Sequence, residues 1–385
     1  MPRLAVALAA WLLLQPAPGP VSPAGLTPIE IAQDWDVVYA VRVVDINADG
    51  RPDILAINPS QLAWFENPSW TKHVILDGAT PRDNVTIAAA DLDGDGRPEI
   101  ALGAAWDPRN TTSGGTLHLA VRTTPDGRAP WRVRQIFEEP TLHRILWADL
   151  GVGGRPSLVV TPLHGRGTSP PEWNGPGARI VVLHPPDTLD GEWKQEVVDD
   201  TRHILHNFLA LDFDGRPGAE LITASREGLT LFTRRPDGTW SSRALVEVTP
   251  GPGEVVLGRV GGRRVFATVE PWHGTSIVTY TEEENGTWRR RVIDDTVTGG
   301  HALGWGDFDG DGHDELVAGW RAKPFALARY HFTPAGELAR REILDEGVAV
   351  EDLAIADLDG DGRPDIVAGG RATQNIRVYL SGGSR

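Results

Sequence analysis

The sequence predicts an all-β fold, a seven-bladed β-propeller of four-stranded blades whose ring is closed by an N-terminal strand. Three observations support this prediction. A unit of apolar strand, acidic loop and second apolar strand recurs seven times, its loops begin 46 to 63 residues apart, and the last unit lacks an outer strand that a segment near the N-terminus can supply. Repeats of about this length are typical of propeller blades.

The repeated unit is best seen in AAADLDGDGRPEIALGAAW and IADLDGDGRPDIVAGG, and weaker copies such as WADLGVGGRPSLVVTPL and LGRVGGRRVFATVEPW keep its apolar strands. The first loop positions of the seven copies are Asp45, Asp91, Asp149, Asp212, Gly258, Asp307 and Asp357. Two further alternating strands follow each copy, which is the pattern of half-buried strands. The unit therefore predicts one four-stranded blade per copy.

The outer strands predict how the ring closes. Six alternating segments of the type TKHVILD and RREILDE follow the first six copies, whereas the chain ends at NIRVYL without one. LTPIEIAQD has the same pattern and precedes the first copy, so we expect it to complete the last blade and remove a free sheet edge. Tryptophans recur near the start of the outer strands, and this regularity predicts packing; they are Trp70, Trp131, Trp193, Trp240 and Trp288.

The N-terminus and the composition indicate an exported protein. Residues 1–24 have the layout of a secretory signal peptide, with an apolar run from Leu4 to Leu14 that is too short to span a bilayer. Residues 25–385 are then a single propeller domain, secreted or periplasmic, with no transmembrane anchor. A net charge of −16 argues against nucleic acid as a partner. The absence of cysteine excludes disulfides and leaves bound Ca²⁺ as the natural staple.

Four acidic loops have oxygen ligands at alternate positions, the arrangement that Ca²⁺ needs. The four predicted calcium sets are Asp45, Asn47, Asp49 and Asp53; Asp91, Asp93, Asp95 and Glu99; Asp307, Asp309, Asp311 and Glu315; and Asp357, Asp359, Asp361 and Asp365. In the fourth blade Arg216 stands where a third carboxylate belongs, so its guanidinium is expected to replace the ion. The alternative is that the aspartates only cap turns; in both cases their role is structural.

These loops resemble the FG-GAP/VCBS repeats of integrin α-chain propellers and of many bacterial exported proteins. The resemblance covers nearly all of the mature chain and implies the propeller fold. It does not choose between adhesion and catalysis, because such propellers host both.

Function is expected where the blades stop being equivalent. Counting six residues back from each loop start gives Tyr39, Val85, His143, His206, Pro252, His301 and Glu351. These positions begin the innermost strands and ring the mouth of the channel opposite the calcium loops. Three neutral imidazoles make a site for Zn²⁺ or another divalent transition metal, so His143, His206 and His301 are the predicted ligands. The alternative is that each histidine only bonds a neighbouring blade's backbone.

The second strands return to the same face and end in a set of polar and aromatic residues. Trp106, Arg226, Trp320 and Arg371 are the predicted substrate-binding residues, and His164, His273, Tyr39 and Arg321 are the predicted catalytic residues. A metal would polarise a carbonyl or hydroxyl, a histidine or Tyr39 would move a proton, and the arginines would hold anionic or enediolate oxygens.

A closer resemblance is carried by LHRILWADL, PLHG, HNFLALDFDG, EPWHG and GGHALGWGDFDGDGHDELVAGWR, which look like the propeller domain of aldos-2-ulose dehydratase. That family dehydrates keto-sugars such as 1,5-anhydrofructose and contains metal ions, although its fungal members add propeller and cupin-like parts that this sequence does not predict. The resemblance implies a secreted, metal-dependent carbohydrate lyase or dehydratase. The alternatives are a non-catalytic propeller that binds a glycan or a protein, and a structural module of an envelope assembly.

Overall fold

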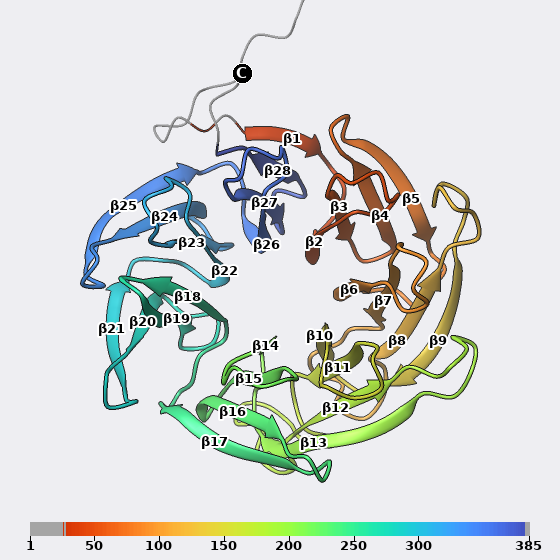
Figure 1. The fold of residues 1–385 in the computed structure, drawn as a ribbon, viewed down its shortest axis with the longest axis horizontal. Coiled ribbons are helices and arrows are strands. Elements are labelled where there is room, and N and C mark those ends of the chain that lie inside the picture. Colours follow the sequence, from red (N-terminus) through yellow and green to blue (C-terminus); the bar gives the residue numbers. More distant parts are fainter. Residues whose placement is uncertain (1–25, 27, 382–385) are drawn as a thin grey trace, which may run out of the picture.

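The computed structural model describes residue 26 and residues 28–381, which form strands and turns without a helix. The strands make seven four-stranded antiparallel sheets, arranged as blades around a common axis (Figure 1). The predicted seven-bladed β-propeller is therefore confirmed. The predicted signal peptide lies outside the described residues.

Each blade runs outward from the axis in the order of its strands. Blade 1 consists of β2 (Ala40–Val44), β3 (Asp53–Ile57), β4 (Gln61–Glu66) and β5 (Thr71–Asp77). Blade 2 consists of β6 (Thr86–Ala90), β7 (Glu99–Ala104), β8 (Thr116–Val121) and β9 (Arg132–Glu138). Blade 3 consists of β10 (Leu142–Ala148), β11 (Ser157–Pro162), β12 (Ala178–His184) and β13 (Lys194–Arg202). Blades 4 and 5 are β14 (Asn207–Leu211), β15 (Glu220–Ser225), β16 (Gly228–Arg234) and β17 (Trp240–Glu247); and β18 (Val255–Val260), β19 (Arg263–Glu270), β20 (Ser276–Glu282) and β21 (Trp288–Asp294). Blade 6 is β22 (Gly300–Gly306), β23 (Glu315–Trp320), β24 (Ala326–Phe332) and β25 (Leu338–Asp345).

Blade 7 closes the ring with strands from both ends of the chain. It consists of β26 (Val350–Ala356), β27 (Asp365–Gly370), β28 (Ile376–Tyr379) and β1 (Pro28–Ala32). β1 pairs antiparallel with β28, with Ile29 opposite Val378, and Figure 1 shows the red first strand beside the blue last one. The predicted closure is confirmed, and it covers what would otherwise be a free edge of β28.

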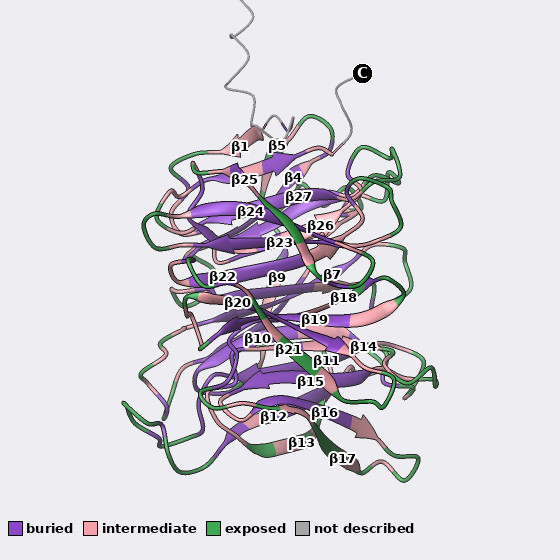
Figure 2. Cartoon of the chain, turned by 90° about the vertical axis from the view of Figure 1, so that its left-hand side faces the viewer, coloured by how far each residue is buried: buried purple, intermediate pink, exposed green. Residues whose placement is uncertain are grey.

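The core lies between the blades, where the second and third strands are buried and the outer strands are partly exposed (Figure 2). One apolar cluster joins Leu55 and Ile57 of blade 1 to Ile87 and Leu102 of blade 2. The recurrent tryptophans belong to these clusters, with Trp131 and Trp193 buried and Trp70, Trp240 and Trp288 packed at the edges. Their predicted packing role is confirmed.

The acidic loops fold around their own carboxylates. In blade 2, Asp91 accepts the backbone N–H groups of Gly94 and Gly96, which adopt positive φ angles, and buried Glu99 accepts that of Leu92. Asp91, Asp93 and Glu99 offer oxygens within 4.8 Å of one another, a group that can hold a metal ion. The same side chains therefore cap the turn and lie close enough together to be able to hold an ion.

The loops that depart from the pattern differ in what fills them. In blade 4, Asp212, Asp214 and Glu220 still converge, and Arg216 is mostly exposed with its Nε 3.7 Å from Asp214, so the guanidinium does not fill the loop. In blade 3, whose loop lacks the carboxylate ligands, Arg155 donates hydrogen bonds to the carbonyls of Leu92 and Pro186.

Tyrosines join neighbouring blades near the ring closure. Tyr330 donates its hydroxyl to Asp294 at the end of the preceding blade, and Tyr379 donates to Asp345 in the same way, each over 2.6 Å. Burial alone would raise the pKa of Asp345, but the hydrogen bonds from Tyr379 and Arg377 hold that pKa below its ordinary value. The ionised carboxylate therefore stabilises the contact between blades 6 and 7.

Replacing Tyr379 with Phe tests this contact. We expect Tyr379→Phe to lower the free energy of unfolding by about 1–3 kcal/mol at pH 7, because a buried carboxylate loses a donor. Asp345 stabilises the fold fully at pH values above its pKa in the unfolded chain, and this stabilisation is lost as the pH falls through its lower pKa in the folded protein. The difference in the free energy of unfolding between the wild type and the variant should therefore shrink in acid. Urea denaturation measures it, with Tyr39→Phe at the channel mouth as the control. An equal loss in both variants would contradict this role.

Candidate functional site

The inner strands begin at one end of the channel, and the hydrogen-bond ladder identifies the equivalent residue of each blade. Tyr39, His206 and Gly253 each donate the backbone N–H to the carbonyl of the facing second strand, at Ile57, Ala224 and Val269. In the degenerate fifth blade this position is Gly253. The sequence count of Pro252 is therefore wrong by one residue, because the shortened loop of that blade shifts the count.

Three blades carry a bulge at this position. The strand register shifts between Leu142 and Arg144, between Gly300 and Ala302, and between Val350 and Asp352. The residues at the shifts are His143, His301 and Glu351. A bulge re-aims the side chain of its extra residue, so the backbone itself departs from the repeat where the side chains become polar.

These residues line a cavity of about 200 Å³ at the channel mouth. Its lining includes eight of the predicted site residues and Glu351, namely Tyr39, Trp106, His143, His206, His273, His301, Arg321, Arg371 and Glu351. The structure thus brings together side chains from all seven blades, which are far apart in the sequence.

Three of the histidines are held in the same way. His143 Nδ1 lies 2.9 Å from the carbonyl oxygen of His206, His206 Nδ1 lies 3.0 Å from that of Gly253, and His301 Nδ1 bonds that of Glu351. Each acceptor is the equivalent residue of the next blade. A carbonyl only accepts, so each Nδ1 carries the proton and each Nε2 keeps its lone pair. The predicted backbone bonds are present, and they leave Nε2 free for another partner.

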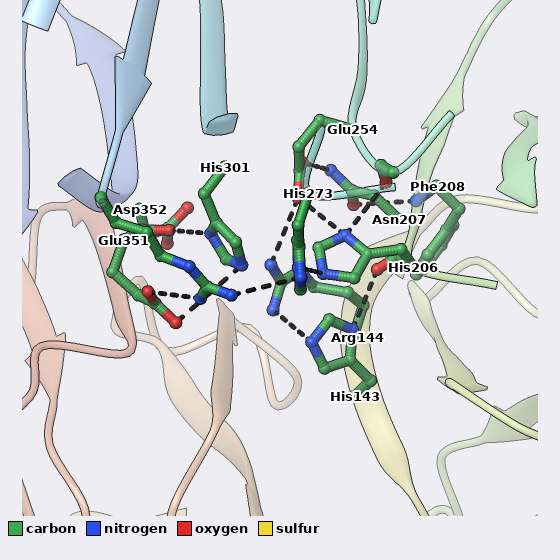
Figure 3. A network of polar contacts seen from close by, with 12 residues as sticks. His143, Arg144, His206, Asn207, Phe208, Glu254, His273, His301, Glu351 and Asp352 are labelled. Carbon is green, nitrogen blue, oxygen red and sulfur yellow. Dashed lines mark hydrogen bonds and ion pairs between the residues drawn. The ribbon is translucent and has the colours of Figure 1, made fainter. Parts of the chain in front are cut away.

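Figure 3 shows the histidines converging. The ring nitrogens of His206, His273 and His301 come within 4.8 Å of one another, a group that can hold a metal ion, and the Nε2 atoms of His206 and His273 are 2.7 Å apart. The sequence placed His143 in this trio. The structure instead places the ring of His143 between those of Trp106 and His206, with ring centroids 4.8 and 4.5 Å away and the ring planes tilted.

The imidazoles are neutral at physiological pH. Burial, followed by the positive charge of Arg144, holds the pKa of His143 and His206 well below the ordinary value of histidine. Burial, followed by Arg321, has the same effect on the pKa of His301, and burial and His206 lower that of His273. Neutral imidazole is the form that binds metals and accepts protons.

Arginines form the other side of the cavity. Arg321 and Arg371 each donate to a different oxygen of the Glu351 carboxylate over 2.7 Å, and Arg321 also reaches Nδ1 of His273 at 3.2 Å. Arg371 lies over the ring of Tyr39, 5.5 Å from its centroid. Two guanidinium groups share one carboxylate, so this side attracts anionic groups.

A layer of buried polar side chains packs against the histidines (Figure 3), and its member Arg144 also lines the cavity. Glu254 pairs with Arg144 over 3.5 Å and accepts a hydrogen bond from Asn207. Burial raises the pKa of Glu254 to about 7. Its Oε1 is 3.0 Å from Nδ1 of His206, although the hydrogen-bond geometry is met at the Gly253 carbonyl. This layer holds the inner strands of blades 3, 4 and 5 together beneath the cavity.

A comparison with known protein families found one match in the N-terminal part of the chain. The family model described as FG-GAP-like repeat matches residues 19–102. The chain carries an FG-GAP-like repeat. The matched region ends within β7, so it covers blade 1, the closing strand and the first acidic loops. No curated protein matches the chain.

Three predicted site residues lie outside the cavity lining. His164 is 2% exposed and stacks on Trp173 with ring centroids 3.7 Å apart. Trp320 packs in the core and donates Nε1–H to Pro324. Arg226 donates to the carbonyl of Glu172 and to Asn174, on the long loop between β11 and β12.

Sequence reasoning missed Arg144, Glu254 and Trp272, and it gave Glu351 no role. Arg144 and Trp272 stand next to His143 and His273 in the sequence, so counting residues from the loops led to the correct segments of the chain. Glu254 belongs to blade 5, where the count from the loop was wrong by one residue. Trp272 lines the cavity and lies edge-on to His164 at 6.2 Å.

Residue 26 and residues 28–381 contain no helical segment with the length and hydrophobicity of a membrane span.

His164 is a buried group whose two ring nitrogens have no hydrogen-bond partner among the described residues. Burial lowers its pKa to about 4 from an ordinary 6.5. The unfolded chain therefore takes up a proton first as the pH falls, and the stability that depends on neutral His164 is lost between those values.

Replacing His164 with Phe keeps a ring on Trp173 and removes both unpaired nitrogens. We expect His164→Phe to be as stable as the wild type at pH 7, and to lose less stability between pH 7 and about pH 4.5. Urea denaturation at the two pH values measures this. An unchanged pH dependence would show that His164 is not a neutral buried group.

Proposed function

We propose that the cavity is the active site of a metal-dependent carbohydrate lyase or dehydratase that acts by β-elimination. One observation carries the proposal. The Nδ1–H groups of His206 and His301 are fixed on backbone carbonyls of neighbouring blades, which leaves neutral Nε2 lone pairs facing a cavity that also holds arginines and a tyrosine. Metal-binding histidines are oriented by this same kind of bond.

The donor set suits a borderline divalent ion such as Zn²⁺. His206 and His301 are the imidazoles whose bonded Nδ1–H groups leave Nε2 for an ion, and the ring nitrogens of His273 lie within 4.8 Å of theirs. Nitrogen donors favour zinc over calcium. A bound ion would supply Lewis-acid polarisation of a substrate carbonyl. His143, which the sequence assigned to the metal, keeps its Nε2 3.4 Å from the guanidinium of Arg144.

The remaining residues fit the steps of an elimination. A base removes the proton next to a carbonyl, the C–H electrons form a double bond, and the C–O bond at the next carbon breaks. His143 is the candidate base, because its Nε2 has a lone pair. Burial raises the pKa of Tyr39, so its phenol is protonated and suited to donate to the leaving oxygen. Arg321 and Arg371 would hold the enolate oxygen.

The size and charge of the cavity favour a small sugar. Its volume of about 200 Å³ is below the roughly 300–1,000 Å³ of most ligand pockets, which suits a single keto-sugar or uronate unit better than a polysaccharide chain. The paired arginines suit an enediolate or a carboxylate, and Trp106 and Tyr39 offer aromatic faces to a sugar ring. The resemblance to aldos-2-ulose dehydratase points to the same substrate class.

Metal content and turnover test the proposal together. We expect the purified protein to contain a stoichiometric transition metal, and to convert a keto-sugar or uronate from a panel into a product that absorbs as an unsaturated carbonyl. His301→Gln should lose the metal and at least about 100-fold in kcat. His73→Gln, which removes an imidazole on outer strand β5, is the control and should change neither. Plasma mass spectrometry and absorbance assays measure both.

A protein without transition metal, and with the same properties in both variants, would contradict the metal site. Sugar binding by calorimetry without any turnover, weakened by His301→Gln, would favour the alternative of a binding propeller.

We further propose that the acidic loops bind Ca²⁺ as a structural ion in an exported protein. Buried Glu99 and Glu315 have pKa values raised to about 7 by burial and neighbouring aspartates, a cost that a bound cation removes. The oxygen-rich loops and the histidine cavity would then select different metals.

Calcium chelation tests this role. We expect EGTA to lower the melting temperature and excess Ca²⁺ to restore it, because an ion that binds only the folded state stabilises it by mass action. Asp309→Asn should reduce the calcium-dependent shift, since this residue belongs to two of the convergent groups. A melting temperature that does not respond to EGTA would leave the aspartates as turn caps.

A further inference from the structure

His273 differs from the other histidines of the cavity in what holds it. His143, His206 and His301 begin inner strands, whereas His273 follows β19 with a φ of 51°, in the left-handed region that non-glycine residues rarely adopt. Its Nδ1 faces no carbonyl. It faces Nη2 of Arg321 at 3.2 Å.

This contact reverses the tautomer. A guanidinium has five N–H donors and no acceptor, so Nδ1 of His273 must accept the hydrogen bond. An imidazole with a lone pair on Nδ1 carries one proton and is neutral. Its single proton therefore sits on Nε2, opposite to the arrangement in His143, His206 and His301.

The contact on the other side of the ring agrees. Nε2 of His273 lies 2.7 Å from Nε2 of His206, and that atom of His206 has a lone pair because its Nδ1–H bonds Gly253. His273 thus donates and His206 accepts. With the reversed tautomer of His273, two lone pairs would face each other at this distance.

Arg321 is itself fixed in place. Its Nη1 donates to buried Glu351 over 2.7 Å, and the backbone oxygen of Glu351 anchors His301. One residue of blade 7 therefore positions two imidazoles, His301 through its carbonyl and His273 through Arg321.

We propose that Arg321, held by Glu351, fixes His273 as the Nε2-protonated tautomer, so that His273 is a hydrogen-bond donor to the substrate oxygen and not a metal ligand. This role rests on the proposed function. In this structure Nε2–H of His273 donates to Nε2 of His206, and an ion held by that lone pair of His206 would leave the same N–H for a substrate oxygen. In the elimination the carbonyl oxygen becomes negative as the neighbouring C–H bond breaks, and Nε2–H of His273 would stabilise that charge without transferring its proton. A neutral imidazole polarises a carbonyl in this way in other enzymes. The positive charge of Arg321 on the opposite nitrogen strengthens the donor.

The tautomers can be measured without an assay of activity. Long-range proton–nitrogen NMR of the full chain, labelled with ¹⁵N-histidine, distinguishes protonated from unprotonated ring nitrogens, and single His→Gln variants assign the signals. We expect the proton of His273 on Nε2, in the protein as purified and after chelation, and those of His143, His206 and His301 on Nδ1. A proton on Nδ1 of His273, or metal coordination by its Nε2, would overturn the proposal.

Two arginine variants test the cause. In Arg321→Met, the Nδ1 signal of His273 should shift to the position of an unprotonated nitrogen that accepts no hydrogen bond. The same variant should lower kcat by about 10²–10³-fold with a smaller change in KM, because an oxyanion donor is lost. Arg371→Met is the matched control, since Arg371 shares Glu351 with Arg321, and it should leave the His273 signals in place. Arg321→Lys repeats the test with a retained charge if the methionine variant does not fold.

The outcomes separate this inference from the proposed function. If the protein turns over a substrate but the His273 signals are unchanged in Arg321→Met, the role of Arg321 would be contradicted and the lyase proposal would not. The expected tautomers in a protein without turnover would contradict the lyase and the donor role that rests on it.

Discussion

The site depends on one hydrogen bond, from Nδ1 of an inner-strand histidine to the carbonyl of the equivalent residue in the next blade. Blades 3, 4 and 6 make it through His143, His206 and His301. The bond ties neighbouring blades at the axis, and it fixes which ring nitrogen faces the cavity. A propeller without these bonds would hold the same imidazoles in undefined tautomers, whereas here the packing of the ring determines their chemistry.

The two ends of the channel differ in how closely the blades resemble one another. At one end the acidic loops of blades 1, 2, 6 and 7 repeat one pattern, with carboxylates such as Asp91 and Glu99 bonded to their own backbone. At the other end the repeat breaks in backbone as well as side chain, through bulges at His143, His301 and Glu351. Seven equivalent blades supply a rigid frame, and the departures from equivalence supply the functional groups.

The sequence predicted the frame and the register of the inner strands, because loops with fixed spacing measure position along each blade. That register placed Tyr39, His143, His206 and His301 at one mouth. It could not separate adjacent residues at a strand end: Trp320 turns into the core and Arg321 into the cavity. Nor could it find the left-handed turn at His273 or the loop that captures Arg226, since both depend on contacts between segments distant in sequence.

We infer that the histidine cavity is the functional centre of this propeller. The most direct measurement is an anomalous-difference map at the zinc edge from crystals of the purified protein. A peak about 2.0–2.1 Å from Nε2 of both His206 and His301 is predicted, with no zinc signal in the acidic loops. Zinc only in the acidic loops, or an empty cavity in crystals grown with added zinc, would contradict the account.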